Sequence, residues 1–234
     1  MKYNKIIPAR FVSRPNRFVA NVKIDGTETA VHVKNTGRCR ELLLPDSVVY
    51  LEDLTENPGN RKLMYDLIAV EKENLLINMD SQAPNKVVRE ALEKGIIRLK
   101  YMGDLTLICP EKTYGKSRFD FYVEDESGQK GFIEVKGVTL ENNRIAAFPD
   151  APTERGVKHI NELIMAKNSG YNAYIIFVLQ MSGMKYLVPN DATHKSFGDA
   201  LRLANSCGVN VLAYECAVTP DSLEITGEIA VKLD

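Results

Sequence analysis

The stretch from Ser117 to Leu140, SRFDFYVEDESGQKGFIEVKGVTL, constrains the fold of this chain more than any other. It predicts two strands joined by a polar turn near Gly128, in a register that sets Asp120 almost opposite Glu134. Because side chains alternate between the two faces of a strand, Asp120, Glu134 and Lys136 are expected on one face of this hairpin. The other face is then expected to carry Phe119, Phe121, Ile133 and Val135.

Two carboxylates that face each other across a hairpin repel, so a positive charge is expected between them. Their hard oxygen atoms suit Mg²⁺ or Mn²⁺, and Lys136 would lie roughly 7 Å beyond Glu134 on the same face, within reach of a phosphate. We therefore interpret Asp120, Glu134 and Lys136 as a metal-dependent centre that cleaves phosphodiesters or binds nucleic acid, with the two carboxylates as metal ligands. The alternative is an amphipathic hairpin with a solvated charged face.

Residues 1–82 have the pattern of an all-β domain with excess positive charge. Short alternating stretches predict about five strands, and Asp25-Gly26 between two of them is a hairpin signal. The first forty residues hold nine Lys and Arg against two acidic residues, although the whole chain has a net charge of −1. Short, closely spaced strands with a basic face favour a small barrel of the OB type, which we interpret as a nucleic-acid-binding domain.

Residues 83–234 mix helices with strands. Pro84-Asn85 begins a helix that Gly95 ends, a second helix is predicted from about Thr153 to Asn168, and a buried strand follows at 173–179. Together with the hairpin, these elements predict an α/β domain, so the whole chain is expected to be a two-domain α+β or α/β protein.

Several classes of protein are not supported by the sequence. The N-terminus lacks the apolar core of a signal peptide, and no apolar run is long enough to span a bilayer, which favours a cytoplasmic protein with no membrane partner. The four cysteines are widely spaced, so neither a zinc site nor a disulfide framework is expected. Without a Walker or Rossmann phosphate loop, ATP-driven and dinucleotide chemistry are not expected either.

Basic residues near the hairpin and in the N-terminal domain are candidate phosphate contacts. Those at the start of the second helix oppose its dipole, which suggests a functional role. For His159, contact with DNA or support of the active site is weighed against a purely structural role. The candidates are Arg14, Arg17, Arg38 and Arg40 in the N-terminal domain, Lys116 and Arg118 at the entry to the hairpin, and Arg155, Lys158 and His159 in the helix.

Seven motifs extend over nearly the whole chain. They are RFVANV (17–22), VKNTGRCREL (33–42), NRKLMYDL (60–67), APNKVVREAL (83–92), YGKSRFDF (114–121), IEVKGVTL (133–140) and FPDAPTERGVKHINEL (148–163). Together they resemble the sugar fermentation stimulation protein A family.

This resemblance implies an N-terminal OB-like domain and a C-terminal domain similar to the PD-(D/E)xK nuclease core, a mixed sheet flanked by helices. In that pattern Asp120, Glu134 and Lys136 are the motif residues, and Glu90 matches an additional acidic catalytic position for which Glu93 competes. The family is described as DNA-binding, with a regulatory role in sugar metabolism.

The first hypothesis is a DNA-binding protein with a nuclease-like phosphodiesterase centre that uses Mg²⁺ or Mn²⁺, with RNA as the other candidate partner. The second is a non-catalytic DNA-binding regulator of sugar metabolism genes. A component of RNA processing or repair, assembled with partners, is a third reading. The sequence leaves the oligomeric state open, with a homodimer as one option.

Overall fold

Six strands form the N-terminal domain of the computed structural model, which describes the whole chain except residues 36 and 38. They are β1 (Ile6–Asn16), β2 (Val19–Ile24), β3 (Thr27–Val33), β4 (Val48–Asp53), β5 (Tyr65–Lys72) and β6 (Leu75–Asn78). Consecutive neighbours in the order β3-β2-β1-β4-β5-β6 are hydrogen-bonded, and a parallel pairing of β3 with β5 closes the first five strands into a barrel. The predicted OB-type barrel is confirmed.

In the N-terminal domain, the local sequence explains both the predicted hairpin and β1, the strand of this domain that the pattern does not predict. Asp25 and Gly26 have φ values of 48° and 84°, as a two-residue turn with two positive φ angles requires, and β2 and β3 pair on either side of them. The sequence does not predict β1, because Pro8 and Pro15 interrupt its alternation. At Pro8 the strand is paired with β4, and its pairing with β2 begins only at Arg10, so the missing N–H of proline faces no second strand.

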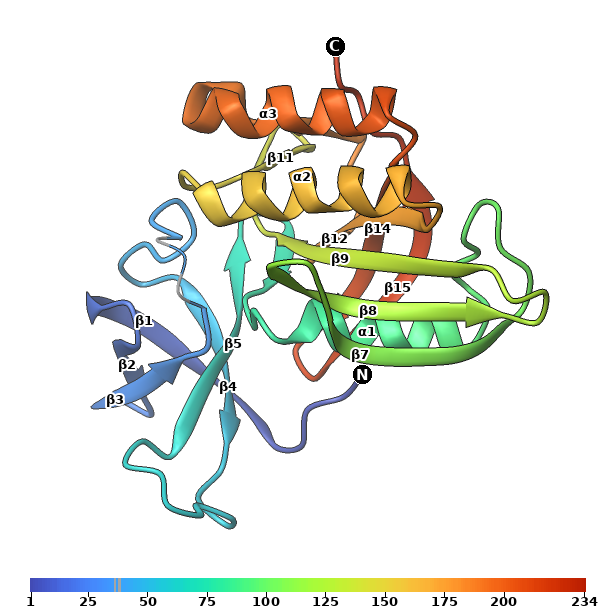
Figure 1. Ribbon diagram of the computed structural model, residues 1–234. Helices are drawn as coiled ribbons and strands as arrows, with labels where there is room; N and C mark the ends of the chain where they lie inside the picture. Colours follow the sequence, from blue (N-terminus) through green and yellow to red (C-terminus); the bar gives the residue numbers. More distant parts are fainter. Residues whose placement is uncertain (36, 38) are drawn as a thin grey trace.

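The C-terminal domain is a mixed sheet with helices on both faces (Figure 1). Its strands in spatial order are β15 (Ser222–Ile229), β14 (Asn210–Thr219), β12 (Asn172–Leu179), β9 (Lys130–Val138), β8 (Ser117–Asp125) and β7 (Leu105–Tyr114). β12 runs parallel to β9 and β14, and the other neighbours are antiparallel. A smaller sheet contains β10 (Glu141–Asn142), β11 (Ile145–Phe148) and β13 (Tyr186–Pro189). The predicted mixed sheet flanked by helices is confirmed.

Three helices cover this sheet. α1 (Ala83–Glu93) packs Val87 and Val88 on one face, whereas α2 (Glu154–Asn168) and α3 (Asp191–Ser206) pack on the other, with Ile160 and Phe197 in the core. Inside α3, His194 has non-helical φ and ψ angles of −155° and 85°, which mark a kink near the start of the helix. Among the described residues, no helix combines the length and apolar character needed to cross a membrane, and all four cysteines are free.

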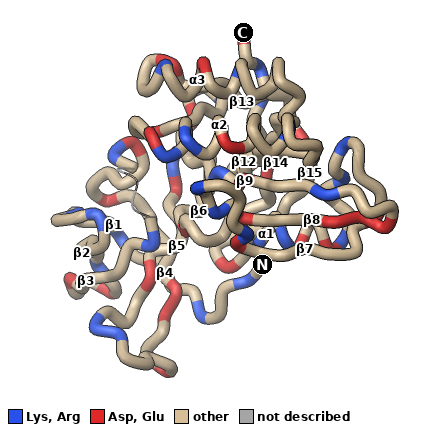
Figure 2. Tube along the Cα trace, viewed as in Figure 1, with Lys and Arg blue, Asp and Glu red and all other residues tan. Residues whose placement is uncertain are grey.

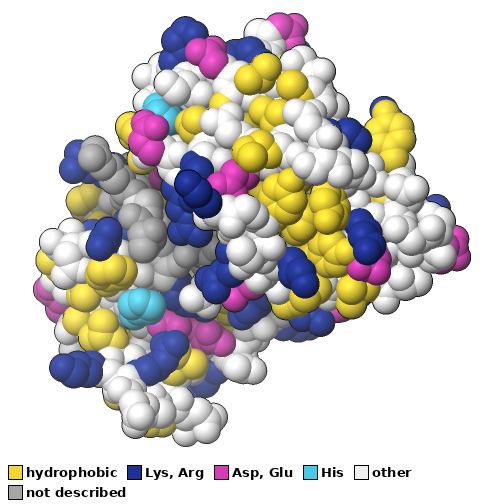
Figure 3. Space-filling model, viewed as in Figure 1, with side chains coloured by type: hydrophobic (Ala, Val, Ile, Leu, Met, Phe, Trp, Pro, Cys, Tyr) yellow, Lys and Arg dark blue, Asp and Glu magenta, His cyan; other side chains and the backbone are white. Residues whose placement is uncertain are grey.

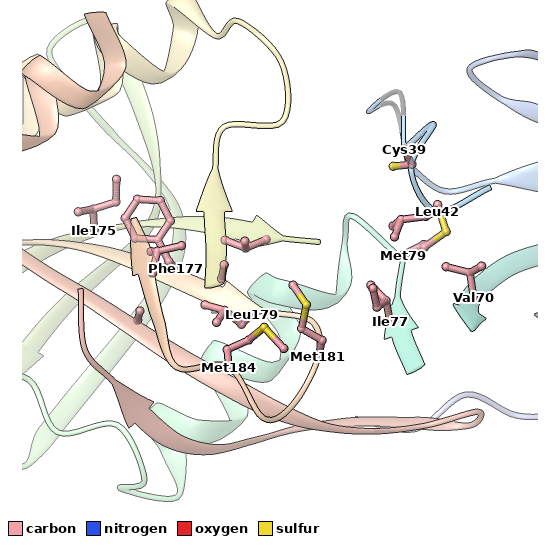
Figure 4. Close-up of a cluster of buried hydrophobic side chains, with 14 of the residues drawn as sticks. Cys39, Leu42, Val70, Ile77, Met79, Ile175, Phe177, Leu179, Met181 and Met184 are labelled. Carbon is pink, nitrogen blue, oxygen red and sulfur yellow. The ribbon is translucent and has the colours of Figure 1, made fainter. Parts of the chain in front are cut away.

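The two domains share one hydrophobic core. Val70, Ile77 and Met79 of the N-terminal domain belong to the same buried cluster as Leu179 and Met181 (Figure 4). Gln180, between these last two residues, adds polar contacts to the barrel. Its Nε2 donates to Asn78 Oδ1 at 2.9 Å and to the main-chain oxygen of Asp80 at 3.0 Å, and its own N–H donates to the main-chain oxygen of Val138 at 2.9 Å. The end of β9, two residues beyond Lys136, is therefore tied to the barrel.

A buried ion pair across this boundary provides a test of the interface. Lys72 Nζ donates to Glu141 Oε1 and, at 3.2 Å, to the main-chain oxygen of Glu141. Burial alone would raise the pKa of Glu141, but the hydrogen bonds from Lys72 and from the Arg144 N–H outweigh it and hold that pKa below its ordinary value of 4.5. A carboxyl pKa that is lower in the folded state stabilises the fold above the unfolded pKa, and this stability is lost as the pH falls.

We expect Glu141→Gln to lower the free energy of unfolding by about 1–3 kcal/mol at neutral pH. Urea denaturation measured between pH 7 and pH 3 should show the difference from the wild type shrinking as the pH falls through the pKa of Glu141. Glu73→Gln, at an exposed glutamate after β5, is the control and should cost little at any pH. A pH-independent loss in Glu141→Gln would contradict this account of the ion pair.

Candidate metal and nucleic-acid site

The predicted hairpin forms from β8 and β9 in the predicted register, with Phe121 opposite Ile133. Beyond that pair the side chain of Asp120 enters the space between the strands. Its Oδ2 accepts a hydrogen bond from the Val135 N–H at 2.7 Å, and its Oδ1 accepts one from Asn85 Nδ2 of α1, also at 2.7 Å. Asp120 is therefore held from the neighbouring strand and from the helix that begins after the barrel.

This use of the Asp120 side chain changes the predicted face of Phe119. The Phe119 ring packs against Phe132 and against the ring of His159 on the α2 side, with centroid distances of 5.4 Å and 6.2 Å. Phe121 lies on the opposite, α1 side as predicted, together with Ile133 and Val135. The prediction for Phe119 is wrong, because the strict alternation of the strand breaks where Asp120 turns toward Val135 and Asn85.

Glu134 lies on the central part of β9 and is only 3% exposed. Its Oε1 accepts hydrogen bonds from Lys136 Nζ and from His159 Nδ1, the latter at 2.6 Å. Its Oε2 is buried and accepts no hydrogen bond from the residues that the structure describes. A buried carboxylate oxygen without a partner is costly in free energy, so a ligand that is absent from the structure is expected at this atom.

The two carboxylates are electrostatically different. Burial, together with the nearby negative charge of Glu134, raises the pKa of Asp120. Burial would also raise the pKa of Glu134, but the hydrogen bond from His159 and the charge and hydrogen bond of Lys136 outweigh it and lower that pKa. Two close carboxylates with opposed pKa shifts indicate a site that lacks positive charge on the Asp120 side.

The donor set fits a divalent cation only in part. Asp120 and Glu134 supply hard oxygen atoms, and the buried Oε2 of Glu134 is available to a ligand. The described residues contain no group of three or more His, Cys, Asp and Glu side chains placed to hold a metal ion. A cation bound here would complete its coordination with main-chain oxygens, water or a phosphate, which is the usual arrangement for Mg²⁺.

Glu90 is placed differently from the other candidates. Its Oε2 accepts a hydrogen bond from the N-terminal amino group of Met1 at 2.9 Å, and its side chain is 40% exposed. Glu93, its competitor, pairs with Arg89 at 2.8 Å. The α1 residue that reaches Asp120 is Asn85, in the first turn of the helix.

Family models match most of the chain. The model described as the SfsA N-terminal OB domain matches residues 12–79, and the one described as the sugar fermentation stimulation protein RE domain matches residues 82–222. The chain belongs to the sugar fermentation stimulation protein family.

Members of this family from several organisms align with the full length of the chain. The homologue from Desulfitobacterium hafniense (strain DSM 10664 / DCB-2) is 55% identical over 100% of this chain and 99% of its own length. The homologue from Clostridium beijerinckii is 54% identical over 100% of both. The solved structure of Pyrococcus furiosus SfsA in complex with Ca²⁺ is 26% identical, covers 99% of this chain and 98% of its own, and superimposes with a TM-score of 0.87.

In this family member the basic candidates of the N-terminal domain have different surroundings. Arg14 donates to the main-chain oxygens of Arg17, Asn35 and Gly37 at 2.6–2.9 Å, so it fixes the loop after β3. The exposed Arg17 lies over the ring of Phe18, 4.8 Å from its centroid. Arg40 is exposed, and Arg38 lies outside the described residues.

The C-terminal candidates lie mostly around the hairpin. Lys158 Nζ donates to the main-chain oxygen of Lys116 at 2.9 Å, which brings α2 and the β7–β8 turn together, and Arg118 pairs with Glu111 at 3.4 Å. Figure 2 shows acidic residues at the β8–β9 turn, whereas Lys and Arg lie at the end of the hairpin that faces the barrel. Figure 3 shows several Lys and Arg side chains on the face of the molecule where the two domains meet. A pocket between the domains is lined by residues of both, among them Ser81 and Gln180.

His159 is not a surface residue, because it is only 5% exposed and its ring contacts Glu134. Sequence reasoning names it without finding this partner, and it does not find Asn85. The sequence does indicate the contact between Arg155 and His159, because side chains four residues apart on one helix lie next to each other. The position of Asn85 next to Pro84 indicates only that it lies in the first turn of a helix, and does not indicate its contact with Asp120.

Proposed function

We propose that this protein binds nucleic acid on the surface where its two domains meet and hydrolyses phosphodiester bonds at Asp120, Glu134 and Lys136 with Mg²⁺ or Mn²⁺. The observation that carries the proposal is the buried Oε2 of Glu134, which has no hydrogen-bond partner among the described residues, beside the half-buried carboxylate of Asp120. A structural hairpin would leave its charged face in water, whereas here both carboxylates are held by hydrogen bonds from three separate elements.

The choice of cation follows from the ligand atoms and the chemistry. Carboxylate oxygens favour hard cations, and the description of the Pyrococcus furiosus relative as a Ca²⁺ complex supports a divalent ion in this family. When bound by Asp120 and Glu134, Mg²⁺ or Mn²⁺ would supply positive charge against the phosphate and make a water molecule more acidic.

The protein's own residues perform the remaining tasks. Asn85 and the Val135 N–H hold Asp120 in place, and His159 holds Glu134. Lys136 Nζ has three N–H groups and uses one on Glu134, so the others are available to orient the attacking water or to stabilise charge on the phosphate. Lys116 and Lys158, beside the hairpin, supply positive charge for neighbouring phosphates.

A cleavage panel tests this proposal. Single-stranded, duplex and branched DNA and the matching RNAs are incubated with the protein in Mg²⁺, in Mn²⁺ and in a chelator. We expect cleavage of at least one substrate that depends on the added cation. Intact binding without cleavage of any substrate in either metal would reject the catalytic part.

A non-catalytic DNA-binding regulator is the second candidate function. The exposed Arg17, which lies over the ring of Phe18, favours it. A basic residue beside an exposed aromatic ring can bind a nucleic-acid strand without a metal. This function predicts DNA binding that persists in chelator, falls steeply with salt and weakens in Arg17→Ala. Binding that needs a divalent cation would exclude it.

A further inference from the structure

The hydrogen bonds of the His159 ring have a defined direction. Arg155 Nε lies 3.3 Å from His159 Nε2. A guanidinium group can only donate, so Nε2 accepts with its lone pair and the ring proton is on Nδ1. His159 Nδ1 therefore donates to Glu134 Oε1 at 2.6 Å. The Phe119 ring packs edge-on against the imidazole and restricts its rotation.

Two donors on one oxygen fix the orientation of the Glu134 carboxylate. Lys136 Nζ approaches Oε1 from β9, and His159 Nδ1 approaches the same atom from α2. The last side-chain torsion of glutamate has broad minima, so the rotamer alone would not decide which oxygen points where. With both donors on Oε1, the buried Oε2 is the oxygen left for another ligand.

The start of α2 is held firmly enough to define this geometry. Thr153 Oγ1 caps the helix by accepting from the Gly156 N–H at 3.0 Å, and the Thr153 N–H donates to His194 Nδ1 at 3.3 Å. A Cβ atom at position 156 would lie 3.1 Å from the Phe197 ring, so α2 and α3 approach each other closely here. Arg155 follows the capping residue within the first turn, and His159 comes one turn later.

We propose that His159, whose Nδ1–H tautomer both Arg155 and Glu134 favour, is a positioning residue that turns Glu134 so that Oε2 faces the divalent cation. This inference rests on the cation site of the proposed function. Partners that hydrogen-bond a ligating side chain typically contribute about 10–100-fold to metal affinity. His159 also keeps Glu134 in place when Lys136 turns toward a phosphate, so the lysine can serve the substrate without releasing the ligand.

The experiment measures Mn²⁺ binding to the full-length protein without nucleic acid, by isothermal titration calorimetry and by electron paramagnetic resonance. We expect His159→Leu to weaken Mn²⁺ binding by about 10–100-fold. His159→Asn, whose amide can place an N–H near the position of Nδ1, should recover most of this loss. In Arg155→Met, the Glu134 carboxylate still accepts from Nδ1 and keeps the Nδ1–H tautomer, so we expect a smaller loss of affinity.

Lys158→Met is the matched control for Arg155→Met. Both variants remove a positive charge from the start of α2, and this change by itself favours cation binding. Weaker Mn²⁺ binding in Arg155→Met alone would therefore come from its contact with His159.

The outcomes separate this inference from the proposed function. If the wild-type protein binds Mn²⁺ and both His159→Leu and Arg155→Met bind it equally well, the positioning role is overturned while the proposed function stands. If the His159 and Arg155 effects appear but no nucleic acid is cleaved, the positioning role is supported and catalysis is rejected. A wild-type protein without Mn²⁺ affinity would overturn both.

Discussion

Asp120→Asn is expected to reduce cation-dependent cleavage by about 100–1,000-fold, since the loss of a ligand charge removes several kcal/mol of transition-state stabilisation. The amide keeps the size of the side chain, and its oxygen can still accept the hydrogen bond from the Val135 N–H. Burial and the charge of Glu134 raise the pKa of Asp120, so the ionised form is unfavourable in the cation-free protein. A neutral side chain removes that cost, and we expect the cation-free variant to be at least as stable as the wild type.

Thermal unfolding with and without Mn²⁺ measures both effects at once. A ligand at 100 times its Kd stabilises the folded state by about 2.7 kcal/mol, so the wild type should shift to a higher Tm and Asp120→Asn should shift little. Asp125→Asn, on the same strand, is the matched control. Hydrogen bonds from Gly103, Ser127 and Gln129 lower the pKa of Asp125, so its charge stabilises the fold.

Asp125→Asn is therefore expected to lower the Tm while keeping the full Mn²⁺ shift and the cleavage rate. The two substitutions make the same chemical change five residues apart on β8, at side chains that share no hydrogen-bond partner. They should have opposite consequences for stability and for cation binding. An Asp120→Asn protein with wild-type cleavage would place the chemistry elsewhere in the molecule.

The hairpin was predictable because its information is local. Alternation at period two and a turn near Gly128 define the register of β8 and β9, which the pairing of Phe121 with Ile133 confirms. The same alternation places Glu134 and Lys136 on one face. It fails at Phe119, because a side chain of the strand itself, that of Asp120, takes the hydrogen bond of the Val135 N–H.

The contacts around the hairpin were not predictable from local pattern. Asn85 reaches Asp120 across 35 positions of sequence, and His159 reaches Glu134 across 25. Both contacts depend on the face of the sheet that each helix covers. The periodicity of apolar residues within a helix does not predict that face. Glu90 pairs with the amino group of Met1, and no motif in the sequence predicts that these two groups lie close together in the fold.

Lys136→Met is expected to reduce cleavage by about 100–1,000-fold while Mn²⁺ binding stays at wild-type strength or becomes tighter. Lys136 is a donor to Glu134 Oε1 and not a cation ligand, and its positive charge competes with a cation for the two carboxylates. Without it, the His159 N–H still holds Glu134 in the same orientation. Single-turnover cleavage and calorimetric Mn²⁺ titration of the same preparation measure the two properties.

This result would distinguish the candidate functions more sharply than cleavage alone. Loss of cleavage with retained cation binding in Lys136→Met, beside loss of both in Asp120→Asn, assigns the lysine to the substrate and the carboxylate to the cation. A non-catalytic regulator predicts another pattern. Neither variant should weaken DNA binding in chelator by more than the loss of one phosphate contact, whereas Arg17→Ala should reduce both the affinity for DNA and its dependence on salt. Because Lys136→Met leaves the cation in place, retained cleavage in this variant would remove the lysine from the mechanism without removing the metal site.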